Sequence, residues 1–434
     1  MVLATDTEVD LGLLGTAFIS RAIGQGGQGH VYEVRHASGR SLALKWYKPQ
    51  CATTEQYREI QTLVDFGSPH TRFLWPLSMA TISQEPGFGY VMPLRESRYV
   101  ELSFLLAGKS PEGEALDVSF TTIIAMCRQL SVSFLRLHSR GLCYRDVSFG
   151  NVFFDPGNGD VLICDNDNVG VDNGTGRVLG TPFFMAPEVV RDLSYRTLPN
   201  TDTDRHSLAV LLFYILCVGH PLEGRRTERG LRDATWLLTH FGTDPLFCLH
   251  PDNDENRPVS TVVEKYWEIY PAFFRRLFVQ AFVDGLHDPN RRVTESEWIK
   301  AFDRLRDGMV QCGNCQATNF WDRAEPDRPC TGCGGSTKPA FVLRIGRRQV
   351  ATSPFASIRA DHLRSGTDES SAVGQVRRHP QDPSRWGLHN LSDRPWTATF
   401  ATGQQFRIEP DNTIELADGL RVDVADAVVF VTSP

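Results

Sequence analysis

The sequence lacks an apolar run long enough to cross a membrane, because a transmembrane helix needs about 18 or more consecutive apolar residues. Its longest apolar stretch covers only Leu208 to Val218. It also lacks an excess of basic residues, since its formal net charge is -7. Met1 to Asp10 carry acidic side chains and no basic segment, so no secretory signal is expected there. These absences argue against a membrane protein and against a broad nucleic-acid-binding surface.

Disulfide-type cysteine spacing is also missing from most of the chain. Six of the ten cysteines are scattered among apolar neighbours, which is typical of buried free thiols in a reducing compartment. We therefore expect a cytoplasmic protein. These six residues are Cys51, Cys127, Cys143, Cys164, Cys217 and Cys248.

The composition is that of a folded chain with several domains. Its 434 residues exceed a typical domain of roughly 100 to 200 residues. Hydrophobic residues make up 41% and charged residues 22%, so most of the chain can bury a core. We expect a multi-domain α+β protein.

The hydrophobic pattern changes three times along the chain. After a short tail at 1–13, strand-like alternation predicts a β-rich lobe at 14–93, and helical spacing predicts a helical lobe at 94–307. Residues 308–338 are rich in cysteine and glycine and poor in apolar side chains. Short alternating runs separated by turn residues predict an antiparallel β-domain at 339–434.

A glycine-rich turn lies between two predicted strands. Gly24 to Val31 fit the pattern G-x-G-x-x-G-x-V, which lets backbone N–H groups approach a triphosphate closely. Lys45 follows on the next predicted strand, where its ammonium can meet phosphates if a carboxylate holds it. Glu59, on a predicted helix, is our first candidate for that carboxylate, and Glu55 is the second.

Two acidic motifs follow in the helical lobe. Tyr144 to Asn151 match H-R-D-x-x-x-x-N with tyrosine in place of histidine. In this pattern Asp146 accepts the proton of a substrate hydroxyl, and Asn151 holds a magnesium ion. Asp165 ends a predicted strand at the position of the D-F-G aspartate, which also binds magnesium.

The segment after these motifs is typical of a peptide-docking surface. It contains Gly180 to Pro182 and Ala186 to Glu188. Asp204, at the start of an apolar helix, is expected to hold the catalytic loop from below. Arg292 is expected to pair with Glu188.

Residues 14–307 thus resemble a protein kinase of the eukaryotic-like (Hanks-type) serine/threonine class found in bacteria. The resemblance implies a bilobal fold that binds ATP with Mg²⁺ or Mn²⁺ between the lobes. It implies transfer of the γ-phosphate to serine or threonine of the chain itself and of a protein partner. The residues with direct roles would be Lys45, Glu59, Asp146, Asn151 and Asp165.

The resemblance also implies an adenine site. Met92 would guard its back, and Arg95 would donate from the hinge, because Pro93 has no backbone N–H. The other residues expected to bind ATP are Ile23, Gly24, Gly26, Gly29, Val31, Ala43 and Phe153.

Three positions depart from the kinase pattern. Ser148 stands where a lysine usually contacts the γ-phosphate, and Asn166 and Asp167 replace the Phe and Gly of D-F-G. A buried asparagine needs polar partners. Asp167 would be a second metal ligand or a solvated acid. These departures support an alternative hypothesis, in which the chain is a pseudokinase scaffold that acts by binding partners.

Regulation by phosphorylation is expected in the segment from Asp165 to Glu188. Arg145 precedes the catalytic aspartate, and such an arginine can pair with a phosphorylated threonine. Thr175 is our phosphosite candidate, with an ordinary loop threonine as the alternative. Thr181 is expected to belong to the docking loop.

Four cysteines form two C-x-x-C pairs at 308–338. Two such pairs give tetrahedral S4 coordination, so a structural Zn²⁺ ion in a zinc ribbon is expected. Metal binding would supply the folding energy that the small apolar content cannot. A redox pair is disfavoured, because no thioredoxin-like βαβ pattern surrounds the cysteines. The four residues are Cys312, Cys315, Cys330 and Cys333.

The last domain resembles a divergent forkhead-associated (FHA) domain, through Trp386 to Ser392, Trp396, Glu409 to Asp411 and Asp418 to Leu420. This resemblance implies an eleven-stranded β-sandwich and, in the family, a phosphothreonine site on loops. A purely structural sandwich is favoured here, because the expected loop residues are not clearly present. The loose candidates are Arg347, Arg348, Ser357 and His362.

The full arrangement is similar to that of bacterial kinases encoded in triads with a PPM-type phosphatase and a von Willebrand A domain protein. The resemblance implies that the phosphatase reverses the kinase reaction. It also implies that the von Willebrand A domain protein is a substrate.

Overall fold

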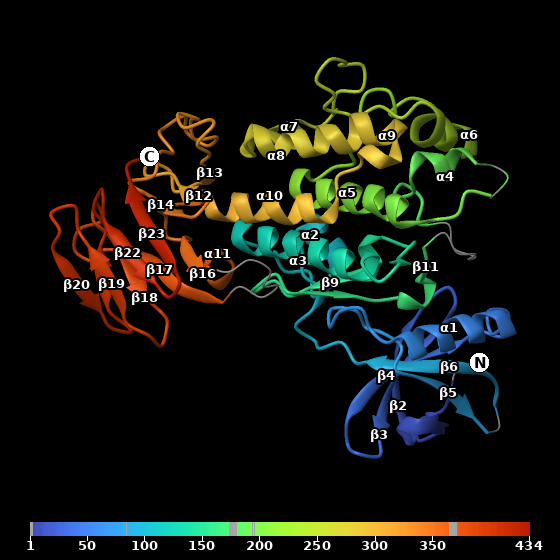
Figure 1. Ribbon diagram of the computed structural model, residues 1–434. Helices are drawn as coiled ribbons and strands as arrows, with labels where there is room; N and C mark the ends of the chain where they lie inside the picture. The colour runs from blue at the N-terminus through green and yellow to red at the C-terminus, as the bar shows by residue number, and fades with distance from the viewer. Residues whose placement is uncertain (1–2, 84, 173–179, 193, 195, 364–370) are drawn as a thin grey trace.

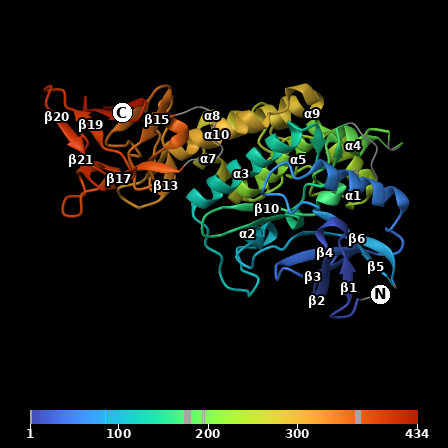
Figure 2. The same cartoon turned by 60° about the horizontal axis from the view of Figure 1, so that its bottom comes forward.

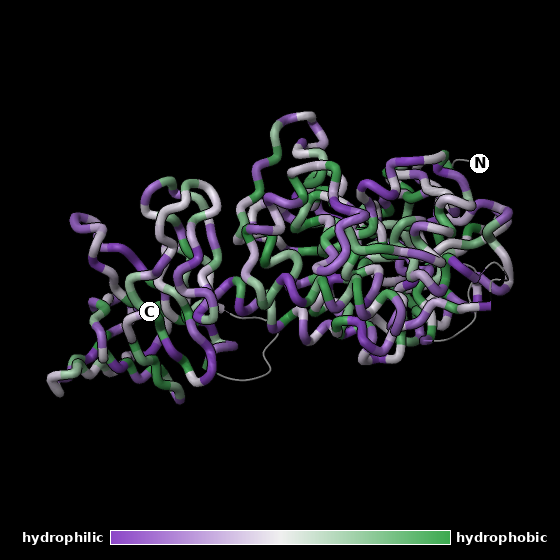
Figure 3. Tube along the Cα trace, turned by 90° about the horizontal axis from the view of Figure 1, so that it is seen from above, coloured by the Kyte–Doolittle hydropathy of each residue, from purple (hydrophilic) through white to green (hydrophobic). Residues whose placement is uncertain are grey.

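The computed structural model describes residues 3–83, 85–172, 180–192, 194, 196–363 and 371–434. The chain forms an elongated molecule with a β-rich lobe at one end, a helical lobe in the middle and a second β module at the other end (Figure 1). The two termini lie at opposite ends, as the turned view also shows (Figure 2). Seen from above, the C-terminal module lies beside the helical lobe (Figure 3).

The N-terminal lobe is a closed barrel with the strand order β1-β2-β3-β4-β6-β5. Side chains alternate between its interior and its surface, with Ile19, Val34 and Leu44 in the core. Helix α1 (Thr54–Phe66) begins where the Thr53 side chain accepts a hydrogen bond from the Gln56 N–H, and it buries Ile60. The strands are β1 (Glu8–Asp10), β2 (Thr16–Gln25), β3 (Gly29–His36), β4 (Ser41–Tyr47), β5 (Ser78–Ile82) and β6 (Glu85–Pro93).

The stretch at 1–13 is not the separate tail that we expected. Strand β1 pairs with both β2 and β5, through Val9 opposite Ala17 and Asp10 opposite Thr81. Val9 is fully buried in the barrel. Three residues are too short for a periodic signal in the sequence, but they complete the barrel.

The second lobe is built around two long helices, α3 (Phe120–His138) and α5 (Thr201–Cys217). The Ser119 side chain caps α3, and Asn200 caps α5 in a capping box. Most of α5 is buried, which explains the apolar sequence of its second half, from Leu208 to Cys217. The other helices are α2 (Leu102–Ala107), α4 (Pro187–Arg191), α6 (Ala234–Leu237), α7 (Thr261–Ile269), α8 (Ala272–Val279), α9 (Gly285–His287) and α10 (Glu295–Asp307).

Short strands and turns place the catalytic segments at the edge of this lobe. Strands β9 and β10 pair with each other, and β7 lies beside β9. The strands are β7 (Val100–Glu101), β8 (Leu142–Cys143), β9 (Val152–Phe154), β10 (Val161–Ile163) and β11 (Gly170–Val171). The short helical turns are η1 (Gly12–Leu14), η2 (Phe149–Asn151), η3 (Asn166–Asn168), η4 (Leu238–Thr243), η5 (Gln280–Asp284) and η6 (Pro289–Arg291).

The cysteine-rich segment packs directly on the helical lobe. Its strands β12 (Met309–Gln311) and β13 (Thr318–Phe320) form a hairpin immediately after α10. The Phe320 ring stacks on Tyr270 with 5.6 Å between centroids, and Arg304 forms two hydrogen bonds with Asp322. In the described part of the chain no helix is long and apolar enough to span a membrane.

The C-terminal module consists of two antiparallel sheets around one core. One sheet has the order β15-β14-β23-β22-β19-β20, and the other has the order β16-β17-β18-β21. Within the described residues the sheets hold ten strands, whereas the FHA resemblance implies eleven. The elements are β14 (Val342–Ile345), β15 (Arg348–Ala351), β16 (Ser357–Arg359), α11 (Ala360–Leu363), β17 (Ala372–Arg378), β18 (Trp386–Asn390), β19 (Trp396–Thr399), β20 (Gln405–Ile408), β21 (Thr413–Glu415), β22 (Arg421–Val424) and β23 (Ala427–Thr432).

A network of charged side chains joins this module to α10. The His362 ring lies 3.1 Å from each carboxylate oxygen of Asp307, and its side chain is fully buried. Asp361 accepts hydrogen bonds from Arg306 at 3.1 Å and from Arg348 at 2.9 Å. His362 and Arg348 therefore hold the two modules together. The fully buried His362 is therefore not open to a phosphothreonine, whereas the Arg348 side chain is 35% exposed.

Of the other two candidates for that site, Arg347 is exposed, and Ser357 is half-buried on β16. Neither residue lies in the network described above. The four candidates for a phosphothreonine site therefore do not form one cluster.

We predict that His362→Ala loosens the contact between α10 and the C-terminal module. The substitution leaves buried Asp307 without one of its partners, at a cost of about 1–3 kcal/mol. Hydrogen exchange should accelerate in Arg306 to Gly308 and in α11, and the denaturation midpoint should fall. His379→Ala, an exposed histidine of the same module, is the control. Equal exchange in both variants would contradict the proposed role of this contact.

Candidate active site

The predicted active-site residues come from both lobes and meet between them. Strands β2, β3 and β4 of the barrel contribute the glycine-rich turn and Lys45. The loop between β8 and β9 contributes Asp146 and Asn151. Asp165 follows β10. These segments are distant in sequence, and the closed barrel and the β9–β10 pair bring them together.

The glycine-rich turn forms the tip of the β2–β3 hairpin. Gly24 pairs with Val31, and the Gly26 N–H donates to the Gly29 carbonyl at 2.9 Å. A Cβ atom at Gly29 would lie 2.5 Å from the carbonyl oxygen of Trp46, so only glycine fits there. The side chain of Gln28, at the tip, accepts a hydrogen bond from Lys45 at 3.3 Å. The turn therefore reaches the charged centre of the site.

Lys45 is buried and lies between two carboxylates. Its ammonium is 3.3 Å from Asp165 and 2.8 Å from Asp167. Burial is the largest influence and lowers the pKa of Lys45, but the charges of Asp167 and then Asp165 outweigh it and raise that pKa above its usual value. Lys45 therefore stays protonated at any physiological pH.

The predicted ion pair between Lys45 and Glu59 is not present. Among the described residues, the ion pairs of Lys45 are with Asp165 and Asp167. Glu59 lies on α1 and lines a small polar cavity of about 110 Å³ that Asp167 and Arg145 also line. Glu59 was predicted from its spacing after Lys45, whereas the carboxylates that pair with Lys45 lie more than a hundred residues further along the chain.

Asp167 is not the solvated acid that was one of our two expectations for it, and its role as a second metal ligand stays a prediction. Its side chain is fully buried, and it accepts a hydrogen bond from the Tyr47 hydroxyl at 2.5 Å. Burial first, and then the charge of Asp167, raises the pKa of Tyr47 above its usual value, so the phenol stays protonated and can donate. The side chain of Gln56, on α1, donates in turn to the Tyr47 oxygen at 3.4 Å.

Asp146 is held in place by three side chains. Its Oδ1 accepts from the Thr181 hydroxyl at 2.6 Å, and its Oδ2 accepts from Asn168 at 3.2 Å and Asn151 at 3.3 Å. Thr181 thus lies at the aspartate that we predicted to be the catalytic base. Asn168 was not identified from the sequence, because no spacing rule relates it to Asp146.

Asn151 and Asp165 both lie near Asp146. The Asn151 amide nitrogen donates to the Asp146 backbone carbonyl at 2.8 Å, which makes the amide oxygen the atom suited to a metal ion. Asp165 has a left-handed backbone, with φ of 49°, and its side chain is 45% exposed. Carboxylate and amide oxygens suit Mg²⁺, which prefers oxygen ligands and retains several waters.

Asn166 is completely buried at the position of the D-F-G phenylalanine. Its amide nitrogen donates to the Ile163 carbonyl at 3.0 Å. Its amide oxygen has no hydrogen-bond partner among the described residues. Asn166 thus has one of the polar partners that its burial requires.

The expected adenine-binding residues lie along the barrel and β9. Met92, on β6, is buried opposite Ala43 of β4. The Arg95 guanidinium lies 4.4 Å from the centre of the Phe153 ring and donates to the Tyr99 carbonyl. Arg95 therefore covers the ring on which we expected adenine to rest. Ile23 and Val31 are partly exposed on the hairpin above.

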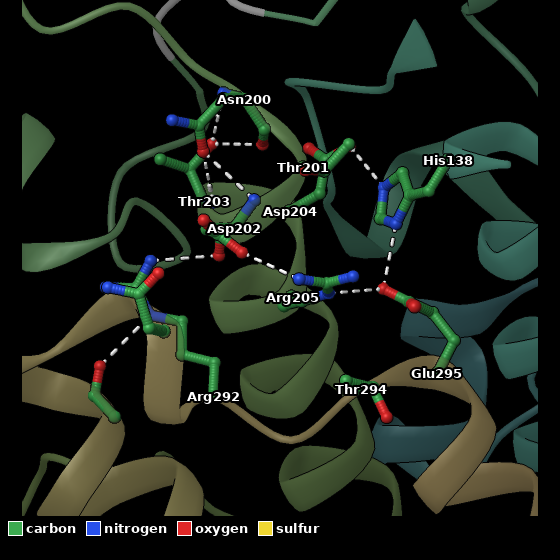
Figure 4. Close-up of polar contacts among 12 residues, drawn as sticks. His138, Asn200, Thr201, Asp202, Thr203, Asp204, Arg205, Arg292, Thr294 and Glu295 are labelled. Carbon is green, nitrogen blue, oxygen red and sulfur yellow. Dashed lines mark hydrogen bonds and ion pairs between the residues drawn. The ribbon is translucent and has the colours of Figure 1, made fainter. Parts of the chain in front are cut away.

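Asp204 supports the catalytic loop from below, as the sequence predicted. It accepts hydrogen bonds from the backbone N–H groups of Tyr144 at 2.5 Å and Arg145 at 2.9 Å. His138 lies 3.0 Å from Asp204 and 2.8 Å from Glu295, and Glu295 also accepts from Arg205 (Figure 4). His138 and Glu295 were not found by motif spacing, since neither belongs to a kinase pattern in the sequence analysis.

The two carboxylates control the protonation of His138. Burial is the largest influence and lowers its pKa, but the hydrogen bonds and charges of Asp204 and Glu295 together raise the pKa of His138 to about 9. Burial raises the pKa of Glu295, but His138 and Arg205 outweigh it and lower that pKa to about 2. Both groups are therefore charged at neutral pH.

The docking segment is anchored by the predicted ion pair. Arg292 donates two hydrogen bonds to Glu188, at 2.8 and 2.7 Å, and Arg292 is almost fully buried. Arg145 has a φ of 72° and donates to the Val171 carbonyl at 3.2 Å. Thr175, the phosphosite candidate, lies outside the described residues.

The four C-x-x-C cysteines come together in space. Their sulfur atoms lie within 4.8 Å of one another, and Sγ of Cys312 and Cys333 are 3.6 Å apart. Tetrahedral Zn–S bonds of about 2.3 Å place the sulfurs about 3.8 Å apart. Asn319 and the Gly332 N–H donate to Cys330 Sγ, as expected around a thiolate ligand. The cluster therefore fits zinc.

The family of the chain follows from comparison with known proteins. A model of the protein kinase domain matches residues 18–242, which is more than half of the chain. The chain therefore belongs to the protein kinase family.

Its relatives include kinases from plants and bacteria. CBL-interacting protein kinase 4 from Oryza sativa subsp. japonica is 26% identical over 50% of this chain, and the calmodulin-binding receptor-like cytoplasmic kinase 2 from Arabidopsis thaliana is 23% identical over 57%. The DNA damage-responsive serine/threonine-protein kinase RqkA from Deinococcus radiodurans is 27% identical over 49%. The chain spans 53%, 61% and 31% of the length of these three relatives.

We predict that the stabilising effect of His138 depends on pH. Its pKa is raised from 6.5 to about 9 by folding, so its contribution is complete below pH 6.5 and is lost as the pH rises to about 9. Denaturation of wild type and His138→Gln should differ by roughly 3 kcal/mol at most near pH 6, because one pKa unit corresponds to about 1.4 kcal/mol. The difference should shrink by pH 9.5.

The control for this measurement is His250→Gln, which replaces a histidine of the same lobe that is only half-buried. A difference between wild type and His138→Gln that stays constant from pH 6 to 9.5 would contradict a charged His138.

Proposed function

We propose that the chain transfers the γ-phosphate of ATP to serine or threonine side chains of proteins, including its own. The observation that carries this proposal is the arrangement around Asp146. Its carboxylate is fixed by Asn151, Asn168 and Thr181, and Thr181 holds a hydroxyl group against it at 2.6 Å. A hydroxyl can thus reach the base of this site.

Each residue of the site has its own role in phosphoryl transfer. Asp146 accepts the proton of the substrate hydroxyl, which lies at hydrogen-bond distance. Lys45 presents a permanent positive charge to the phosphates from the barrel side. Asn151 and Asp165 would hold Mg²⁺ or Mn²⁺, which neutralises charge on the phosphates when bound. The backbone of Gly24, Gly26 and Gly29 would cover the phosphates.

Ser148 adds no charge to this site. It lies half-buried two residues after Asp146, and a hydroxyl can only supply a hydrogen bond to the γ-phosphate. Positive charge from the protein therefore comes mainly from Lys45. This dependence makes the placement of Lys45 the main requirement for activity.

We assign the modules as follows. Residues 14–307, together with the β1 segment before them, form the bilobal kinase domain, and 308–338 form a zinc ribbon. Residues 339–434 form an FHA-like β-sandwich with a docking or regulatory role. Support for the last assignment comes from the two sheets around one core, while His362 and Arg348 argue for a structural role.

The family resemblance suggests the partners and the compartment. We propose a protein substrate such as a von Willebrand A domain protein, and a PPM-type phosphatase that opposes the kinase. We place the protein in the cytoplasm, where its six scattered cysteines would stay reduced.

Kinase activity is tested by transfer of labelled γ-phosphate from Mg-ATP, with mapping of the modified residues. Wild type should incorporate phosphate, whereas Asp146→Asn and Lys45→Met should each lose about 100-fold or more in rate. Asp252→Asn, an exposed acid of the same lobe, should match wild type. Mapping will show whether Thr175 is modified. Wild type that is silent with Mg²⁺ and Mn²⁺, with and without a protein substrate, would favour the pseudokinase scaffold.

We expect the zinc ribbon to need its metal to fold. Purified protein should contain stoichiometric zinc, and Cys330→Ser should lower both the zinc content and the melting temperature of the ribbon. Cys51→Ser, which changes a half-buried cysteine of the N-terminal lobe, is the control. Substoichiometric zinc together with four reactive thiols at these positions would disprove the site.

A further inference from the structure

We propose that Asp167, and not Glu59, is the carboxylate that positions Lys45 for the phosphates of ATP. This inference rests on the proposed kinase function and adds a residue to its site. It assigns a positioning role to an aspartate at the place where the D-F-G pattern has glycine. No spacing rule predicts that role.

The contacts of Asp167 leave its carboxylate no freedom. Oδ1 accepts from the Lys45 ammonium at 2.9 Å, and Oδ2 accepts from the Tyr47 hydroxyl at 2.5 Å. Oδ2 also lies 2.8 Å from the ammonium, and the Asp167 side chain is completely buried. Charge-assisted hydrogen bonds of this length are the strong ones, and burial strengthens them further. Asp167 therefore fixes where the ammonium points.

Strand geometry explains why Tyr47 takes part. Lys45 and Tyr47 are two residues apart on β4, so their side chains project from the same face of the strand. Both therefore reach the same carboxylate. Gln56 then ties Tyr47 to α1, the helix that carries Glu59. Helix α1 thus influences Lys45 through a chain of hydrogen bonds.

Asp165 cannot replace Asp167 in this role. It is also within 3.3 Å of Lys45, but its side chain is 45% exposed. A metal ion bound to Asp165 would compete with Lys45 for its oxygens. Asp167 is enclosed, so it keeps its hold on the ammonium when Asp165 turns to a metal. A buried ammonium needs such a permanent partner, because an unpaired charge in the interior costs several kcal/mol.

The turn η3 brings Asp167 to this position. Asp165, just before η3, has the left-handed backbone, and Asn166 to Asn168 then form a single turn. Within this turn Asn168 reaches outward to Asp146 and Gln28. Asp167 points to the barrel instead. The turn η3 thus places Asn168 against Asp146 and Asp167 against Lys45.

The first measurement needs no catalytic activity. Amines of the nucleotide-free protein are labelled with acetic anhydride, and the rate at Lys45 is followed by mass spectrometry. Asp167→Asn, which is nearly isosteric, should speed the labelling of Lys45 about tenfold or more, and Tyr47→Phe should have a smaller effect. Glu59→Gln should change it by less than twofold. Asp65→Asn, an exposed acid on α1, is the matched control. Melting temperatures show which variants are folded.

The second measurement is steady-state kinetics with Mg-ATP. Asp167→Asn should lose roughly 100-fold in kcat/KM for ATP, on the scale of losing one preorganised charged group. Tyr47→Phe should mainly raise KM, since it loosens the position of Lys45 without removing charge. Glu59→Gln should lose at least tenfold less than Asp167→Asn. Asp65→Asn should match wild type.

The two measurements separate the possible failures. Absence of phosphate transfer by wild type would overturn the proposed function, while the labelling still decides which acid holds Lys45. Faster labelling of Lys45 in Glu59→Gln than in Asp167→Asn would overturn the inference, even if the chain is an active kinase. So would a larger loss of kcat/KM in Glu59→Gln.

Discussion

Burial of the Lys45 ammonium is the constraint on which the arrangement of the cleft depends. A protonated amine buried between the two lobes must have a negative partner, and the partner must not be drawn away by other ligands. The structure supplies Asp167 from the second lobe, and Tyr47 holds it from the first, with Gln56 donating a hydrogen bond to Tyr47. The two lobes are therefore joined at the point where they have to cooperate. Asp165, whose side chain is 45% exposed, lies beside this pair.

A second buried charge, that of Asp204, fixes the catalytic loop in place. Asp204 holds two backbone amides of the catalytic loop, and His138 and Glu295 complete the charge balance below it. These groups are enclosed and mutually satisfied, which is the condition under which buried polar networks become rigid. Asp146 thus sits on a rigid support, while the glycine-rich turn above it contacts the site through the side chain of Gln28.

Motif spacing predicted the residues whose positions depend on local chain geometry. Asp146, Asn151 and Asp165 lie in one cleft, and Arg292 pairs with Glu188, because short loops after strands and helix ends have few alternatives. Spacing failed where a contact depends on how distant segments pack. Glu59 follows Lys45 at the usual spacing in sequence. The carboxylate that pairs with Lys45 is instead that of Asp167, in the turn η3 far along the chain. The alternation of the C-terminal runs predicted strands, but nothing local could show that His362 would meet Asp307 of α10.

Helix α10 joins the C-terminal module to the support of the catalytic loop. Its N-terminal end carries Glu295, which belongs to the support of the catalytic loop, and its C-terminal end carries Asp307, which binds His362. Thirteen residues separate these ends by about 20 Å of continuous helix. One continuous helix thus contributes residues to both charged networks.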